Sequence, residues 1–334
     1  MMGFMDLLFV PTLGPLHIKQ PRYNAVTLVE ITREFGPDGV LIASYSDEGL
    51  REGVWREDEE LGLFFLLPWA EEASVEVFGV AEGVEELRGE AERFRDYLAE
   101  MPRGREYLEE EARWRAPLEE LLSLELSPEV WRDGAVLRRV EEYLAKVRER
   151  FGEGPATGFL SRRVEMIWRR LGSLPEGRYA VWVDLLDLPE LLAAFPGARL
   201  PGPRAPTEAE EARAILDRAW VLEEGDDPAG LLHELARVGG TEAAYLAAQI
   251  YLASGQVQDA LALLEESAAE VPAFPEYLPG YLLARLGQLR DLVGKRELAM
   301  QAYRRVMELP WAPADAREVA RAGLRAPFRV GYSS

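Results

Sequence analysis

The sequence predicts an α/β domain built on a mainly parallel sheet, followed by an all-helical domain. The first 200 residues contain four apolar runs of strand length, at 5–10, 40–44, 74–81 and 178–186. Helical patterns separate these runs, and strands that alternate with helices favour a parallel sheet flanked by helices. From residue 207 onward the pattern is helix and turn only. We therefore expect one domain over 1–203 and a second over 204–334.

The chain opens with the apolar run MDLLFV, a loop that carries His17, and a helical stretch over 24–35. Asn24 is placed to cap this helix, and Gly36 is placed to end it. Helical spacing predicts one buried stripe, which consists of Leu28, Ile31 and Phe35. The next run, GVLIAS, is apolar without alternation, as expected for a strand covered on both faces. Together these segments predict a βαβ unit.

The middle of the α/β domain contains a long helical insertion at about 83–172. Before it, LGLFFLLPW at 61–69 predicts a buried helix, and SVEVFGVA alternates as a strand does. The glycines of GEGPATG break the insertion at 152–158. After the fourth strand comes a short helix with Asp187 in the N-cap position, and then a final short strand at 198–200.

Charge and composition argue against several partners. The formal net charge of −21 disfavours nucleic acid, because that kind of binding depends on Lys and Arg neutralising phosphates. The arginines alternate with glutamates at helical spacing, which is typical of solvated helix faces. No apolar run approaches the roughly 20 residues needed to span a bilayer, and the start of the chain lacks the basic region of a secretory signal. We expect a cytoplasmic protein that binds neither nucleic acid nor membrane.

The chain has no cysteine, which excludes disulfides and thiolate metal sites. Only three of the 38 basic residues are lysines, at positions 19, 146 and 295. The absence of oxidisable thiols and the bias toward Arg and Glu lead to the hypothesis of a thermophilic source.

Familiar catalytic and ligand motifs are missing from the chain. GEGPATG is not followed by the GK[ST] of a phosphate-binding loop, and no GxSxG elbow is present. EEGDDPAG at 223–230 lacks the alternating carboxylates of a calcium loop, so we interpret it as a turn. His233 has no second histidine near it and is interpreted as a surface or packing residue. No cofactor is predicted, and metal binding stays open.

Three polar residues are the candidates for catalysis. His17 follows the first strand, and Asp184 stands at the end of the fourth. The carboxyl ends of parallel strands form the edge where such sheets bind ligands. Glu30 is a further carboxylate within the same unit. A hydrolase site of His17, Asp184 and Glu30 would work by acid–base chemistry, or with a metal that carboxylates help to bind.

Five segments in this order resemble the TraB, ChaN and erythromycin esterase-like superfamily: VPTLGPLH, PDGVLIAS, SVEVFGVA, SRRVEMIWRRL and YAVWVDLLDLPELLAAF. The resemblance covers about residues 5–200. It implies a polar centre for hydrolysis or metal binding, made of a His after the first strand, a Glu closing the second and a His after the late strand. Of these only His17 has a match, because Ala43 or Ser44 replaces the Glu and the late His falls around Asp184 to Asp187. The resemblance therefore implies a degenerate member.

The helical half contains two copies of a helix–turn–helix pattern. The first copy has small or apolar residues at Ala244, Ala247, Ala248, Ala260, Leu264 and Ala268. The second has Leu283, Leu286, Ala299 and Tyr303 at comparable places. The turn glycines Gly255 and Gly294 are 39 residues apart, against a nominal period of about 34. The pattern resembles tetratricopeptide repeats over 207–324, and the resemblance implies protein binding.

The candidate partner-binding residues of this half are Gln249, Tyr251, Tyr281 and Arg285. From residue 207 to the end, 13 Arg and Lys oppose 20 Asp and Glu, so a basic ligand is favoured over an acidic one. The sequence thus predicts a non-catalytic interaction or scaffold protein that binds a protein or peptide. A helical bundle that only supports the sheet domain, and a hydrolase at the strand ends, are the alternatives. The oligomeric state stays open.

Overall fold

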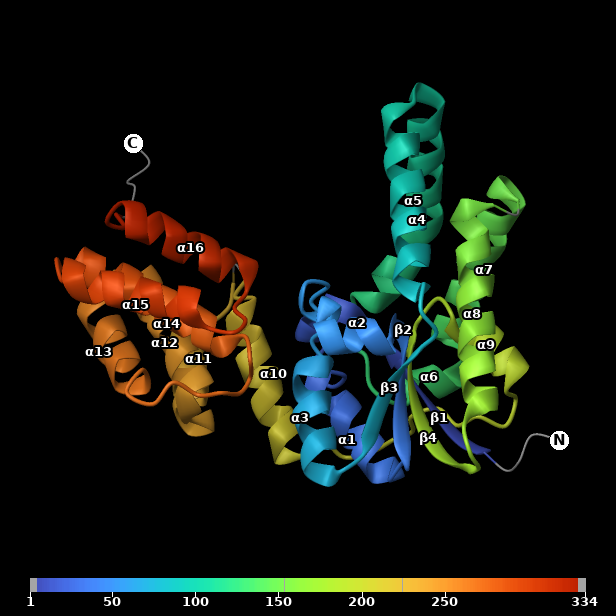
Figure 1. Cartoon of the computed structure of the whole chain (residues 1–334), viewed down its shortest axis with the longest axis horizontal. Helices are drawn as coiled ribbons and strands as arrows, with labels where there is room; N and C mark the ends of the chain where they lie inside the picture. Colours follow the sequence, from blue (N-terminus) through green and yellow to red (C-terminus); the bar gives the residue numbers. More distant parts are fainter. Residues whose placement is uncertain (1–4, 153, 224, 330–334) are drawn as a thin grey trace. The chain divides into compact units, whose positions relative to one another are not determined.

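The protein is described by a computed structural model that covers residues 5–152, 154–223 and 225–329. The chain divides into two compact units, Met1–Glu211 and Ala212–Ser334 (Figure 1). The division falls inside helix α10 (Glu208–Trp220), beyond the linker at 203/204 where we expected it. Helix α10 begins with the predicted capping box, in which the Thr207 N–H donates to Glu210 and the Glu210 N–H donates to the Thr207 hydroxyl.

The first unit is built on a four-stranded parallel sheet. Its strands are β1 (Met5–Thr12), β2 (Gly39–Ser46), β3 (Glu76–Val80) and β4 (Gly177–Asp184), in the order β1-β4-β2-β3. All four strands were predicted and are confirmed. Strand β4 pairs with both β1 and β2, so the two strands of the opening βαβ unit are not neighbours. The short strand expected at 198–200 is only a single bridge between Leu8 and Arg199.

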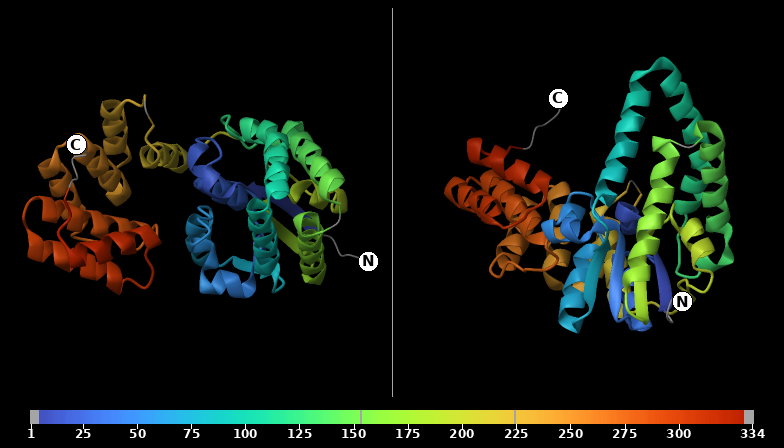
Figure 2. Two further views of the ribbon diagram at one scale, coloured as in Figure 1. Left: turned by 90° about the horizontal axis from the view of Figure 1, so that it is seen from above. Right: turned by 45° about the vertical axis from the view of Figure 1, so that its right-hand side comes forward.

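Helices α1 (Ala25–Phe35) and α3 (Leu63–Ala73) cover one face of the sheet (Figures 1 and 2). The Asn24 side chain caps α1 by accepting hydrogen bonds from the N–H groups of residues 26 and 27. Gly36 ends the helix in the left-handed conformation, with φ of 61°. On this face the Trp182 indole of β4 donates to the Thr32 hydroxyl at 2.9 Å. The predicted cap, the predicted stop and the buried stripe of α1 are confirmed.

The opposite face packs against α8 (Pro155–Ser173), α9 (Leu188–Ala194) and the start of α4 (Val84–Glu100). Its core is a continuous apolar cluster that includes Phe9, Leu41, Val181, Ile167, Leu171 and Leu188. Residues on alternate positions of β1 and β4 therefore point to opposite layers, which makes this unit a sheet between two layers of helices.

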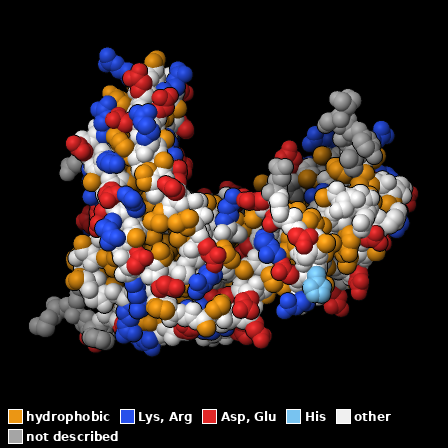
Figure 3. Space-filling view, turned by 180° about the vertical axis from the view of Figure 1, so that it is seen from behind, with side chains coloured by type: hydrophobic (Ala, Val, Ile, Leu, Met, Phe, Trp, Pro, Cys, Tyr) orange, Lys and Arg blue, Asp and Glu red, His pale blue; other side chains and the backbone are white. Residues whose placement is uncertain are grey.

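The helical insertion lies between β3 and β4, as predicted. It contains α4, α5 (Pro102–Leu122), α6 (Val130–Asp133), α7 (Ala135–Phe151) and α8. Helices α4 and α5 form a hairpin that projects past the sheet (Figure 1). The buried Glu111 joins α4, α5 and α7, because it accepts from Tyr143 at 2.6 Å, from Arg95 at 2.7 Å and from Arg115. Basic and acidic side chains mingle over the surface of this hairpin, as their spacing predicted (Figure 3).

Short elements connect the strands of the first unit to its longer helices. These are the 3-10 turns at Gly14–Lys19 and Val54–Arg56 and the helix α2 (Asp47–Glu52). The Ser46 hydroxyl caps α2 by accepting from the Gly49 N–H at 2.9 Å.

The second unit consists of paired helices. After α10 come α11 (Pro228–Val238), α12 (Gly240–Ala253), α13 (Val257–Ser267), α14 (Leu278–Leu292), α15 (Arg296–Glu308) and α16 (Ala314–Arg325). Gly255 and Gly294 take left-handed φ values of 76° and 78° in the turns after α12 and α14, where the sequence placed them. No helix in the described part of the chain is long and apolar enough to cross a bilayer.

Candidate functional site

His17 lies in the 3-10 turn after β1, and its ring is completely buried. The backbone N–H of Leu13 donates to Nε2 at 2.9 Å, and Nδ1 lies 2.8 Å from the carbonyl oxygen of Tyr23, to which it donates. Both ring nitrogens are therefore engaged by the backbone. Burial lowers the pKa of His17 to about 4, against the raising effect of the Tyr23 carbonyl, so the ring is neutral at pH 7. This environment is that of a structural brace in the loop.

The other two predicted catalytic residues lie apart from His17. Asp184 ends β4 opposite Thr12, and its carboxylate accepts from the Leu186 N–H at 2.7 Å. Glu30 lies on α1, where it pairs with Arg33 at 3.0 Å. In the described residues no polar contact joins any two of His17, Asp184 and Glu30. Within the same residues no three His, Asp or Glu side chains are arranged to hold a metal ion.

The carboxyl end of β4 has a buried ion pair that sequence reasoning missed. Asp187 stands in the N-cap position of α9, as predicted, but its side chain makes no capping bond. Its Oδ2 lies instead 2.6 Å from Nε of Arg163, which comes from α8, and Asp184 lies 3.6 Å from the same guanidinium. Burial raises the pKa of Asp187 to about 7, because desolvation outweighs the attraction of Arg163. The pair ties the last helix of the insertion to the end of β4.

Polar contacts to helices also occupy the carboxyl ends of β2 and β3. The N–H and hydroxyl of Ser46 both donate to Glu85 of α4, at 2.7 and 2.8 Å. The Gly79 N–H donates to Asp47 at 2.7 Å, and Arg170 of α8 donates to the other oxygen of that carboxylate. Each of these contacts attaches a helix to the sheet edge, so this edge is held together by polar side chains in structural roles.

A cluster of aromatic rings in the second unit brings together three helices. Trp220 of α10 lies 5.2 Å from the ring of Tyr245 of α12 and 5.3 Å from the ring of Tyr281 of α14, measured between centroids. The rings of Tyr245 and Tyr281 are 6.4 Å apart. Tyr245 is buried, whereas Trp220 and Tyr281 are half-buried and offer part of their surface to solvent. Such rigid, partly exposed rings are common at binding surfaces.

A buried polar network is hydrogen-bonded to the Trp220 ring of this cluster. Glu242 of α12 accepts from the Trp220 indole at 2.7 Å and from the Tyr277 hydroxyl at 3.0 Å, and it pairs with Arg213 at 3.0 Å. Arg213 also pairs with Asp217 at 2.9 Å. Burial raises the pKa of Asp217 to about 7, although Arg213 opposes the shift. The network fixes the positions of the Trp220 and Tyr277 rings and leaves the charge of Glu242 compensated.

Three of the four predicted partner-binding residues join this cluster. Gln249 and Arg285 lie close enough to the Tyr245 hydroxyl to lower its pKa against the raising effect of burial, and the Tyr281 ring lies tilted beside the Tyr245 ring. Tyr251 lies in the last turn of α12 and makes none of the ring contacts of the cluster. The sequence pattern did not indicate Trp220, because α10 lies outside the two repeat-like copies, and it did not single out Tyr245, which lies within the first copy. We call the surface of Trp220, Tyr245, Gln249, Tyr281 and Arg285 the aromatic face.

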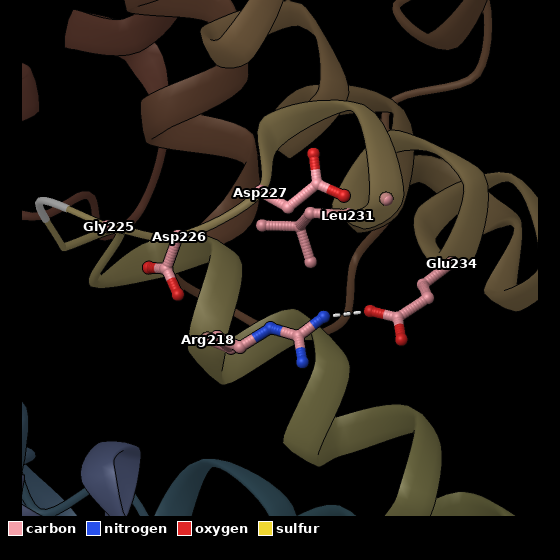
Figure 4. Close-up of a pocket in the computed structure, with 7 residues that line it drawn as sticks. Arg218, Gly225, Asp226, Asp227, Leu231 and Glu234 are labelled. Carbon is pink, nitrogen blue, oxygen red and sulfur yellow. Dashed lines mark hydrogen bonds and ion pairs between the residues drawn. The ribbon is translucent and has the colours of Figure 1, made fainter.

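A small pocket of about 270 Å³ lies at the turn before α11 (Figure 4). Its polar side chains already interact within the pocket wall. Arg218 pairs with Glu234, Asp226 accepts from the Glu223 N–H, and Asp227 caps α11 by accepting from the Ala229 N–H. These groups are engaged with one another and with the backbone. We therefore interpret the pocket as part of the turn that the sequence EEGDDPAG predicted.

Comparison with models of protein families, with curated proteins and with solved structures found no match.

Proposed function

We propose that the protein is a non-catalytic interaction or scaffold protein, and that its aromatic face binds a peptide segment of a partner protein. The observation that carries this proposal is the convergence of Trp220, Tyr245 and Tyr281 from three helices, with two of the rings half-exposed. Trp, Tyr and Arg are the residues that contribute most to the binding energy of protein interfaces. The hydrogen bond from Trp220 to Glu242 keeps the Trp220 ring in place, which reduces the entropy lost on binding.

The arrangement of the helices supports the same proposal. The pairs α12–α13 and α14–α15 follow one another, each with a left-handed glycine in its turn. The aromatic face uses α12 and α14, the first helix of each pair, together with α10. We propose that this unit works as a short tetratricopeptide-like module, in which such first helices share one binding surface.

The sheet domain supports the non-catalytic part of the proposal. His17 has both ring nitrogens engaged by the backbone, and the polar side chains at the strand ends hold helices in place. We propose that this domain is a degenerate relative of the TraB, ChaN and erythromycin esterase-like superfamily. In this proposal it serves as a structural platform.

The charge of the second unit favours a partner with basic residues. Residues 223–276 contain 11 Asp and Glu but only one Arg, whereas residues 285–329 contain 5 acidic and 10 basic residues. The negative charge is therefore concentrated in the α11–α13 half of the unit. Such a field speeds the encounter with a basic segment, and the effect weakens as salt is added.

The test is a selection of random peptides on the intact protein, followed by binding measurements with the selected sequences. We expect peptides that bind with micromolar affinity and lose about tenfold or more in affinity with Tyr281→Ala, since a hot-spot residue is worth about 2 kcal/mol or more. Tyr97→Ala is the matched control, because Tyr97 is 57% exposed on α4 of the other unit. Selected peptides that bind Tyr281→Ala as well as the wild type would contradict the proposal.

A hydrolase at the carboxyl ends of the strands is the second candidate. The observation that favours it is the half-buried carboxylate of Asp184, which lies beside Arg163 and the buried Asp187. The pKa of Asp187, about 7, suits a proton-transfer group. A panel of ester and phosphoester substrates tests it. The control is Asp259→Asn, because Asp259 is an exposed residue of α13. Loss of hydrolysis in Asp184→Asn but not in this control would favour an enzyme over an interaction protein.

A further inference from the structure

We infer that the aromatic face contains a subsite for the carboxylate of a bound peptide, centred on Arg285. This inference rests on the proposed function and adds the chemistry by which one group of the peptide is recognised. The subsite consists of Arg285 and Gln288 of α14 with Tyr245 and Gln249 of α12, which lie beside the ring of Tyr281.

Two half-buried arginines of this unit, Arg285 and Arg317, have no counter-charge among the described residues, and Arg317 instead donates to the backbone carbonyls of Ala312 and Leu309. Arg290 pairs with Glu265 at 3.3 Å, and Arg296 pairs with Asp291 at 3.0 Å. In the part of the chain that the structure describes, Arg285 forms no ion pair. Its Nε–H is buried and has no acceptor among the same residues. An uncompensated, partly desolvated guanidinium is unfavourable, and an anion bound there removes the penalty.

Asp315 does not supply this charge. Asp315, at the start of α16, is close enough to Tyr245 to act on the pKa of its hydroxyl. Its carboxylate, however, accepts from the Ala316 N–H at 2.8 Å and makes no ion pair with Arg285. Arg285 thus combines a missing carboxylate with a buried Nε–H that has no acceptor among the described residues, which makes it suited to bind an anion from outside the chain.

The polar neighbours of Arg285 are arranged as hydrogen-bonding groups for an oxyanion. Arg285 donates through one NH₂ group to the side-chain amide oxygen of Gln288 at 2.8 Å, and Arg285 and Gln249 both lie close enough to the Tyr245 hydroxyl to lower its pKa. These contacts orient the guanidinium while its Nε–H stays unused. A carboxylate next to Arg285 would gain a charge-assisted bond, and the ligand's adjacent side chain would pack on Tyr281 and Trp220.

The local charge favours a carboxylate over a phosphate. The subsite offers one positive charge, whereas phosphorylated segments are bound by clusters of arginines. The acidic α11–α13 half would also repel a dianion more strongly than a monoanion. The net charge of the chain does not prevent local anion binding, since exposed charges are screened beyond about 8 Å at physiological salt.

The experiment compares two probes that differ only in charge, N-acetylleucine and N-acetylleucinamide. The intact ¹⁵N-labelled protein is titrated with each probe while the arginine Nε–H signals are followed by NMR. We expect saturable shifts with N-acetylleucine, at a Kd of about 1–10 mM for so small a ligand, and none with the amide. Arg285→Gln should weaken binding about tenfold or more, and Arg285→Lys should weaken it less because the charge remains.

Arg290→Gln is the matched control, because Arg290 lies on the same helix and already pairs with Glu265. Thermal unfolding of each variant checks that it is folded. Equal binding of the amide, unchanged binding by Arg285→Gln, or a stronger response to inorganic phosphate would each overturn the inference. The selected peptides separate the two proposals. Peptides that depend on Tyr281 but not on Arg285 would leave the proposed function standing and remove the subsite.

Discussion

Arg163 of α8 and Asp187 at the start of α9 face each other with Nε and Oδ2 2.6 Å apart, and both side chains are buried. The contact joins the end of the helical insertion to the segment that follows β4. Nearby, Asp184 shares the same guanidinium at 3.6 Å. Because the three residues come from α8 and the end of β4, we expect them to hold the insertion against the sheet.

Removing one partner of this pair should be strongly destabilising. Arg163→Gln leaves the Asp187 carboxyl buried without its cation, and losses of about 3–5 kcal/mol are typical of such changes. Urea unfolding of the intact protein measures the loss. The control is Arg162→Gln, since Arg162 pairs with Glu90 in solvent and should contribute less than about 1 kcal/mol. Equal losses for the two variants would show that the Arg163 pair has no special role.

The same pair should make stability depend on pH. The pKa of Asp187 is raised to about 7 in the folded protein, so the folded state binds a proton more tightly than the unfolded state. The stabilising contribution of Asp187 to the free energy of unfolding is therefore complete below about pH 4. It is lost as the pH rises to 7, with a slope of at most about 1.4 kcal/mol per pH unit. Unfolding free energies at pH 4 to 8 should show this decline in the wild type and a weaker one in Asp187→Asn. An unchanged slope in the variant would contradict the assignment.

The titration of His17 should change the stability with pH in the opposite direction. Burial lowers its pKa to about 4, so the unfolded state binds the proton more tightly and stability falls as pH drops from about 6.5 toward 4. The full effect is about 3 kcal/mol for a shift of this size. The variant His17→Gln should lose this dependence, whereas His233→Gln should keep it because His233 is exposed. A wild-type profile that matches the His17→Gln profile between pH 4 and 6.5 would count against the buried neutral ring.

Local signals predicted the elements of the fold well. Helix α1 has its cap and its stop in the residues beside it, Asn24 and Gly36, so the segment from 24 to 36 contains the information. The order of the strands could not be predicted in this way. Strand β4 enters between β1 and β2 through contacts such as that of Thr12 with Asp184, which are 172 positions apart in the sequence. Long-range pairing of this kind leaves no periodic pattern in the chain.

The candidate sites were harder to predict because their chemistry depends on neighbours from other elements. His17 is engaged by a backbone carbonyl and a backbone N–H, and neither shows in the side-chain sequence. The local pattern assigned Asp187 to a cap, but Arg163, 24 residues earlier, takes its carboxylate. Tyr281 and Arg285 were predicted from helix position, whereas Trp220, which lies beside Tyr281, comes from a helix outside the repeat-like copies.

The packing around Tyr303 predicts that Gly→Ala substitutions have opposite effects at crowded and at open sites. Gly287 of α14 and Gly323 of α16 both approach its ring, and a Cβ at either site would lie 2.3 Å from a ring carbon. Gly287→Ala should therefore destabilise the second unit by about 1–3 kcal/mol in thermal unfolding. Gly158→Ala in α8 has open space and should stabilise by up to about 1 kcal/mol. The double variant Gly287→Ala with Tyr303→Leu should recover part of the loss, because the smaller side chain makes room. A loss that is the same with either residue at 303 would contradict this packing explanation.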